Sequence, residues 1–259
     1  MSAAVTAHRW YRWVDRELAR MDPETDWERM VSLHVSHQIP VLGLAMMVFP
    51  STMRMMQPAQ GAATLAHTGK LERHPGRRFH DGNHYLMAWM VDGVTSAAGK
   101  AAAERLNRVH HAVDRGSPQL PGNFDDVDDF VYPLVLLATT SDRLCTALGL
   151  RGTSEAMKIA WHRWAQALFR QLERASGPLA GEAFPQDWNA MTEFATMFDA
   201  RSYEPTPAGQ RLATAMTEHF ARRWFPAPVR WFGRDLTRFL AGERVSRQHG
   251  LGWLSPGRE

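Results

Sequence analysis

The chain contains very little cysteine: Cys145 is the single thiol among 259 residues. A disulfide within the chain needs two thiols, and zinc or iron–sulfur sites built on cysteine need several, so both are excluded. Cys145 lies beside Leu144 and Leu148 in a helical pattern, which predicts a buried and unreactive side chain.

Signals for strands and for a strong net charge are also lacking. No Asn-Gly or Asp-Gly pair separates two alternating apolar runs, which argues against β-hairpins. The 30 basic and 27 acidic residues leave a formal charge of +3, which is too small and too dispersed to indicate a nucleic-acid partner.

Long apolar runs are absent as well. The two most apolar stretches, Ile39–Phe49 and Phe130–Ala138, each contain a proline and are shorter than the roughly 20 residues that a spanning helix needs. Met1–Arg20 lacks the apolar centre of a secretory signal. We therefore expect a soluble, cytoplasmic protein without a transmembrane segment.

Large apolar side chains and imidazoles, in contrast, are plentiful. The chain has 10 Trp, 14 Met, 12 Phe and 12 His. Such a mixture suits a protein that wraps a flat hydrophobic cofactor, and an ordinary helical core would use the same Trp and Met. Composition alone leaves these two interpretations open.

Apolar residues recur every three or four positions along most of the chain, which predicts an all-α fold. We expect a single domain of about ten helices over residues 1–259. The expected helices are 10–21, 22–50 with a kink near Pro40, 61–68, 85–92, 97–113 capped by Thr95 or Ser96, 130–148, 153–174, 187–198, 208–225 and 229–240. A basic connector is expected at 69–81 and a long loop at 115–129.

Several apparent motifs are better explained as ordinary structure. Gly93–Lys100 has five residues between its glycines and no preceding strand, so it is not a phosphate loop. His34 and His37 have helical ligand spacing but no acidic residue placed to complete a metal site. The aspartates of 125–129 do not match a calcium loop, and we expect the last of them to cap the following helix.

One histidine lies on an apolar helix face. On a helix over 97–113, His110 shares a face with Ala103, Leu106 and Val113, so it should point inward. His111 should point outward, on the polar face of Glu104, Asn107 and Arg108. An inward histidine is either a hydrogen-bonded core residue or an axial ligand of haem iron. Arg108, four residues after Glu104, fits a surface salt bridge.

A succession of short segments then narrows the choice. They are Thr68–Asp81 (TGKLERHPGRRFHD), Gly93-x-x-Ser96-x-x-Gly99-Lys100, Asn107-Arg-Val-His110 and Asp128-Asp-Phe-Val-Tyr132. In order and spacing, over about 65 residues, they resemble the catalytic domain of the MpaB/rubber oxygenase (latex-clearing protein) family. His80 stands where the family usually has Asp, and Gly82 where it usually has Thr.

The resemblance implies a globin-like core that holds haem b, with His110 as the proximal iron ligand. Arg78, Asn107 and Arg108 are implied as further cofactor-binding residues, the two arginines at the haem propionates; Arg78 is alternatively a distal group that stabilises bound oxygen. His80 and Asp81 are candidates for proton transfer.

Other residues of the matching region have a structural interpretation. Asp128, Asp129 and Tyr132 are expected to hold the loop and the following helix together. Met87, Trp89 and Met90 either wall the haem or belong to the plain core.

The function that the resemblance implies is dioxygen-dependent oxidation. We expect a haem b-dependent oxygenase or oxidase, with Arg78, His80 and Asp81 as catalytic residues, acting on a small hydrophobic or aromatic substrate. Two alternatives stay open: a non-catalytic haem protein that stores or senses oxygen, and a cofactor-free helical interaction domain in which the histidines are structural.

Overall fold

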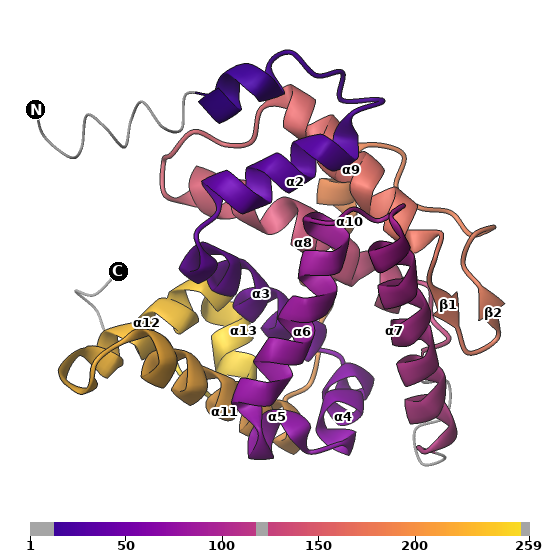
Figure 1. Cartoon of the computed structure of the whole chain (residues 1–259). Helices are drawn as coiled ribbons and strands as arrows, with labels where there is room; N and C mark the ends of the chain where they lie inside the picture. Colours follow the sequence, from indigo (N-terminus) through magenta and orange to yellow (C-terminus); the bar gives the residue numbers. More distant parts are fainter. Residues whose placement is uncertain (1–12, 118–123, 255–259) are drawn as a thin grey trace, which may run out of the picture.

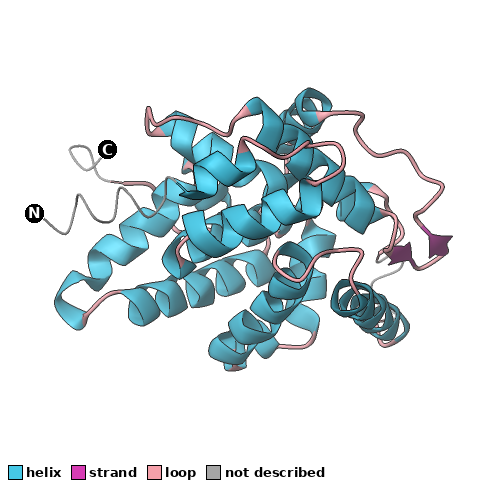
Figure 2. Ribbon diagram, turned by 45° about the horizontal axis from the view of Figure 1, so that its top comes forward, coloured by secondary structure: helices cyan, strands magenta, loops and turns pink. Residues whose placement is uncertain are grey.

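Helices make up almost all regular structure in the computed structural model, which describes residues 13–117 and 124–254 (Figure 2). The elements in that part of the chain are α2 (Trp27–Gln38), α3 (Val41–Met55), α4 (Ala59–His67), α5 (Lys70–Arg73), α6 (Pro75–Met90), α7 (Ala97–Arg115), α8 (Asp128–Ala147), α9 (Glu155–Phe169), β1 (Glu173–Arg174), β2 (Gly177–Pro178), α10 (Trp188–Ala200), α11 (Pro207–Trp224), the 3-10 turn Ala227–Val229, α12 (Arg230–Ala241) and α13 (Glu243–Gln248). The predicted all-α class is confirmed.

Side-chain caps set where several helices begin. Ser96, one of the two predicted caps, accepts a hydrogen bond from the Gly99 backbone N–H at 3.0 Å and so caps α7. Asp187 caps α10 and Thr206 caps α11 in the same way. Because these oxygens satisfy backbone N–H groups that have no partner inside the helix, the start of each helix is encoded locally.

The predicted kink near Pro40 is a full break. Helices α2 and α3 meet there at an angle of 112°. None of the described helices is by itself both long and apolar enough to cross a bilayer; α2 and α3 meet that criterion of length and composition only when taken together, despite the bend. Helix α3 then continues through Pro50 to Met55, five residues beyond the predicted end.

The basic connector predicted for residues 69–81 is wrong. That segment forms α5 and the first half of α6, which begins at Pro75. Proline fits at this first helical position because its missing N–H would have no partner there. The helical pattern is hidden in the sequence because glycines and charged residues dominate the segment and apolar residues are few.

The end of the predicted helix over 153–174 also needs correction. Helix α9 stops at Phe169, and the chain then forms the two-residue antiparallel pair β1–β2, which is too short to leave an alternating pattern. The terminal helix α13 was not predicted either.

Cys145 is partly exposed, so its predicted burial is wrong. Trp10 of the first predicted helix and residues 118–123 of the predicted loop lie outside the described residues.

Two apolar clusters form the core, and α3 contributes to both. The larger cluster centres on α8 and α9, where Trp161, Trp164 and Phe169 are fully buried. The smaller one joins α3 to α11 and α12 and includes Met53 and Phe220. Helix α3 packs on α8 and on α12, so it links the two clusters (Figure 1).

Candidate functional site

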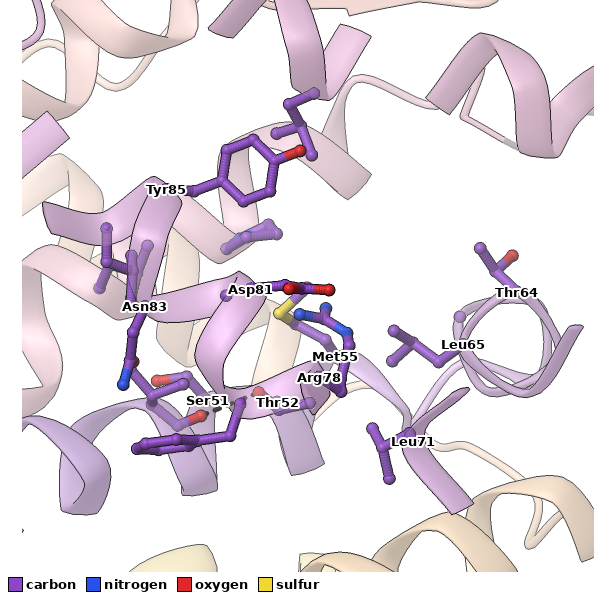
Figure 3. A pocket seen from close by; sticks show the side chains of 18 of the residues that line it. Ser51, Thr52, Met55, Thr64, Leu65, Leu71, Arg78, Asp81, Asn83 and Tyr85 are labelled. Atoms are coloured by element: carbon purple, nitrogen blue, oxygen red, sulfur yellow. Dashed lines mark hydrogen bonds between the residues drawn. The ribbon is translucent and has the colours of Figure 1, made fainter. Parts of the chain in front are cut away.

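A large cavity lies between the helices of both clusters. Its volume is about 720 Å³, within the range of sites for cofactors and small molecules. Residues of α3, α4, α6, α7, α8 and α11 line it, and most of their side chains are apolar. Figure 3 shows part of this wall, with Met55, Leu65 and Leu71 around the polar side chains of Arg78 and Asp81.

Helix α7 presents the predicted apolar face to the cavity. Leu106, His110 and Val113 all line it, whereas His111 does not. The inward direction of His110, predicted from steps of three and four residues, is therefore confirmed. Its ring stacks on Phe124, with centroids 4.2 Å apart, and meets the edge of Phe130 at 5.8 Å.

The surroundings of His110 keep its imidazole neutral. Burial, with smaller contributions from the positive charges of His111 and Arg78, lowers the pKa of His110 to about 4. The atom Nδ1 is buried and has no hydrogen-bond partner in the described part of the chain. A buried nitrogen without a partner is costly in a finished core, and a metal ion bound there would satisfy a ring nitrogen.

A metal-binding histidine usually has a carbonyl or carboxylate that orients its ring, and no residue of 13–117 or 124–254 pairs with His110 in this way. The neighbouring His111 has such a partner instead, because its Nε2 lies 3.0 Å from Oε2 of Glu173 in β1. The polar face of α7 is thus covered by the β1–β2 pair. His111 is partly buried there, and its predicted outward direction holds only relative to the cavity.

Asn107 and Arg108 both lie outside the cavity lining. Asn107 is buried, and its amide donates to the Gln171 carbonyl at 2.9 Å and accepts from the Glu173 N–H at 3.1 Å. Arg108 is exposed and lies 4.0 Å from Glu104, as the surface salt-bridge interpretation expects. These contacts favour structural roles, and the predicted contact of either residue with a cofactor has no support in the described geometry.

Substitutions of these two neighbours should separate their roles. We expect Asn107→Ala to reduce the free energy of unfolding by about 2 kcal/mol, because it leaves two backbone groups unpaired. Arg108→Ala should change it by less than about 0.5 kcal/mol, since exposed ion pairs contribute little. Urea unfolding checks both values, and equal losses would contradict this assignment.

The three predicted catalytic residues all reach the cavity from α6. Arg78 and Asp81 are half-buried, and His80 is exposed at the edge of the lining. Asp81 binds the ammonium of Lys70, and this hydrogen bond is the main reason that the pKa of Asp81 lies below its usual range. Asp81 is therefore an ionised carboxylate at neutral pH. Lys70 was not predicted as part of the site.

The acidic motif at the start of α8 has mixed roles. Asp128 pairs with Arg201 at 2.7 Å, and Tyr132 donates a hydrogen bond to Asp199, so both hold elements together as predicted. Asp129 lines the cavity, and its carboxylate makes no hydrogen bond or ion pair with any described residue. Burial, followed by repulsion from Asp126 and Asp128, raises the pKa of Asp129 to about 6.

The raised pKa of Asp129 predicts a stability that depends on pH. The folded chain holds the proton of Asp129 more tightly than the unfolded chain does, so stability falls as pH rises from about 4 to about 6. Asp129→Asn should match the parent near pH 4 and be more stable at pH 7, by about 1 kcal/mol because the side chain is partly screened by solvent. Urea unfolding at both pH values tests this, and a gain of the same size at pH 4 would contradict it.

Helix α11 adds residues that the sequence did not indicate. His219 and Arg223 line the cavity, and the central carbon of the Arg223 guanidinium lies over the Phe79 ring, 4.7 Å from its centroid. The Nε2 atom of His219 is buried without a described partner. Burial and the charges of Arg223 and Arg222 lower the pKa of His219. His219 is therefore a second histidine with a free ring nitrogen.

The cavity fits the implied haem in its donor set. It has a neutral imidazole with an unpartnered nitrogen, an apolar wall, and the cations of Arg105 and Arg223 for acidic groups. Trp89 lines it, while Met90 is buried in the core. No cluster of three or more His, Cys, Asp or Glu able to hold a bare metal ion occurs in residues 13–117 and 124–254. Haem iron needs no such cluster.

Comparison with known proteins identifies a family for the chain. The chain matches the family model described as ER-bound oxygenase mpaB/B′/rubber oxygenase, catalytic domain, over residues 34–259. That range includes every helix that lines the cavity. No curated protein is similar enough in sequence to match. The chain therefore belongs to the mpaB/rubber oxygenase catalytic-domain family.

Proposed function

We propose that the chain is a haem b-dependent oxygenase or oxidase that uses dioxygen on a small hydrophobic or aromatic substrate, with the iron held by His110. The observation that carries this proposal is the neutral His110 imidazole, with a buried unpartnered nitrogen, in the apolar wall of a 720 Å³ cavity. Membership in an oxygenase family supports dioxygen and a small molecule as the reactants.

The chain prepares His110 for this role by desolvating it. With a pKa of about 4, the ring is neutral at neutral pH, so one of its two nitrogens keeps a free lone pair for a metal. The stacked Phe124 and the edge of Phe130 fix the plane of the ring. Bound haem would supply the binding and activation of dioxygen, which no side chain of the protein can provide.

Asp81 and His80, both on α6, would handle protons during the reaction. Asp81 is held ionised by Lys70, so at neutral pH it accepts a proton and does not donate one. His80 lies at the exposed edge of the lining, where solvent reaches it. The remainder of the cavity wall is mostly apolar, which favours a hydrophobic substrate.

An absorbance spectrum of the purified protein, combined with a pyridine haemochrome assay, tests the cofactor. We expect a Soret band and one haem b per chain. Oxygen uptake measured with an electrode should then depend on both haem and an added hydrophobic substrate. A protein that stays colourless after haem supplementation would favour the cofactor-free interaction domain, and haem without substrate-dependent oxygen uptake would favour an oxygen-binding or sensing protein.

A further inference from the structure

The guanidinium of Arg78 has no bonded partner in the part of the chain that the structure describes. It reaches the cavity from α6 and makes no hydrogen bond or ion pair with any described residue. Burial lowers the pKa of Arg78, and the attraction of Asp81 offsets this only in part. The carboxylate of Asp81 is itself bonded to Lys70. Two cations thus share one anion, which leaves one positive charge in excess at this wall.

Gly82 has no side chain at the point where it faces the guanidinium of Arg78. A Cβ atom added at Gly82 would lie 3.1 Å from Nη1 of Arg78, which is closer than an ordinary van der Waals contact. The absence of a side chain at residue 82 therefore keeps the surroundings of the guanidinium open. Figure 3 shows Arg78 and Asp81 on the same side of the cavity, with Met55 and Leu65 near them.

A desolvated cation in an apolar cavity selects an anion. Its own ion-pairing capacity is unused, and a planar guanidinium offers two parallel N–H groups that match the two oxygens of a carboxylate. The cavity wall also includes Val48, Phe49, Met55 and Leu65, whose hydrocarbon side chains suit an apolar body. The combination describes a ligand with one acidic end and a hydrophobic remainder.

We propose that the substrate class is a hydrophobic monocarboxylic acid whose carboxylate binds the guanidinium of Arg78 while its hydrocarbon part lies against the apolar wall of the cavity. As a statement about substrate, this rests on the proposed function. As a statement about binding, it rests on Arg78, Gly82 and the apolar wall alone.

Equilibrium binding tests the proposal without turnover. Decanoate, decanamide and decan-1-ol are titrated into the full chain in its haem-loaded form, and intrinsic tryptophan fluorescence or calorimetry reports the dissociation constants. We expect decanoate to bind at least about tenfold more tightly than decanamide or decan-1-ol, as a charge-assisted hydrogen bond predicts. This comparison uses the unmodified protein, so it does not depend on the folding of a variant.

Variants then assign the selectivity to Arg78. Arg78→Gln should weaken decanoate binding roughly 10- to 100-fold and leave decanamide unchanged. Gly82→Thr should weaken decanoate selectively, because its side chain crowds Nη1. Arg77→Gln is the matched control, since Arg77 is the exposed neighbour of Arg78 on α6 and does not line the cavity.

The results that would overturn the proposal are specific. Equal affinities for decanoate and decanamide would exclude the carboxylate site. Loss of the Soret band in Arg78→Gln, with decanoate binding unchanged, would assign Arg78 to a propionate of the cofactor. Substrate-dependent oxygen uptake without acid selectivity would refute this inference alone, whereas acid selectivity in a protein that consumes no oxygen would support it and refute the proposed function.

Discussion

Replacing His110 with alanine is expected to lower haem affinity by more than about 100-fold, because even changes to residues that only orient a metal ligand cost roughly 10- to 100-fold. The substitution removes the neutral ring whose Nδ1 is buried and unpartnered at the cavity wall. Soret absorbance after gel filtration, with pyridine haemochrome for quantity, measures the haem retained per chain.

Two other histidines provide controls of different kinds. His111→Ala should retain haem, because His111 faces Glu173 and not the cavity. His219→Ala should also retain it: although Nε2 of His219 is buried and unpartnered, the adjacent Arg222 and Arg223 disfavour a metal cation there. Haem loss in His219→Ala, with retention in His110→Ala, would move the iron site to α11.

The His110–His111 pair shows what a sequence pattern can establish. Steps of three and four residues on one helix distinguish the cavity face from the opposite face, because helical geometry is local and regular. The burial of Asn107 was not predictable in this way. It depends on the β1–β2 pair, which comes from a segment more than 60 residues away and has strands of two residues each.

The sequence also did not indicate the part of the cavity wall that α11 supplies. The helical pattern of α11 was recognised, but nothing in it indicates that His219 and Arg223 meet α6. Such contacts depend on how helices pack and not on the periodicity of either helix. The first half of α6 was missed for a related reason: its glycines and charges give weak helix propensity, and packing against α7 and α11 overrides that propensity.

The acidic residue that joins α3, α8 and α10 was not identified from the sequence at all. Asp199 accepts hydrogen bonds from Tyr132 and, at 2.7 Å, from Arg143, and its carboxylate lies 3.1 Å from Arg54. Burial opposes ionisation of Asp199, but Arg54, Tyr132 and Arg143 together outweigh it and hold the pKa of this carboxyl below its usual range. The side chain is 16% exposed, so little solvent screens these contacts.

Asp199→Ala is therefore expected to reduce the free energy of unfolding by about 3–5 kcal/mol, the range for removing one partner of a buried ion pair, and to lower Tm by about 10 °C. Glu155→Ala, which removes an 87% exposed carboxylate paired with Lys158, is the control and should cost less than about 0.5 kcal/mol.

Because the pKa of Asp199 is lower in the folded chain, the contribution of Asp199 to stability is present at neutral pH and is lost as pH falls through that folded pKa. The gap between Asp199→Asn and the parent should accordingly narrow in acid. A gap that stays constant down to the acid limit of folding would mean that Asp199 stabilises the three helices through packing and not through its charge.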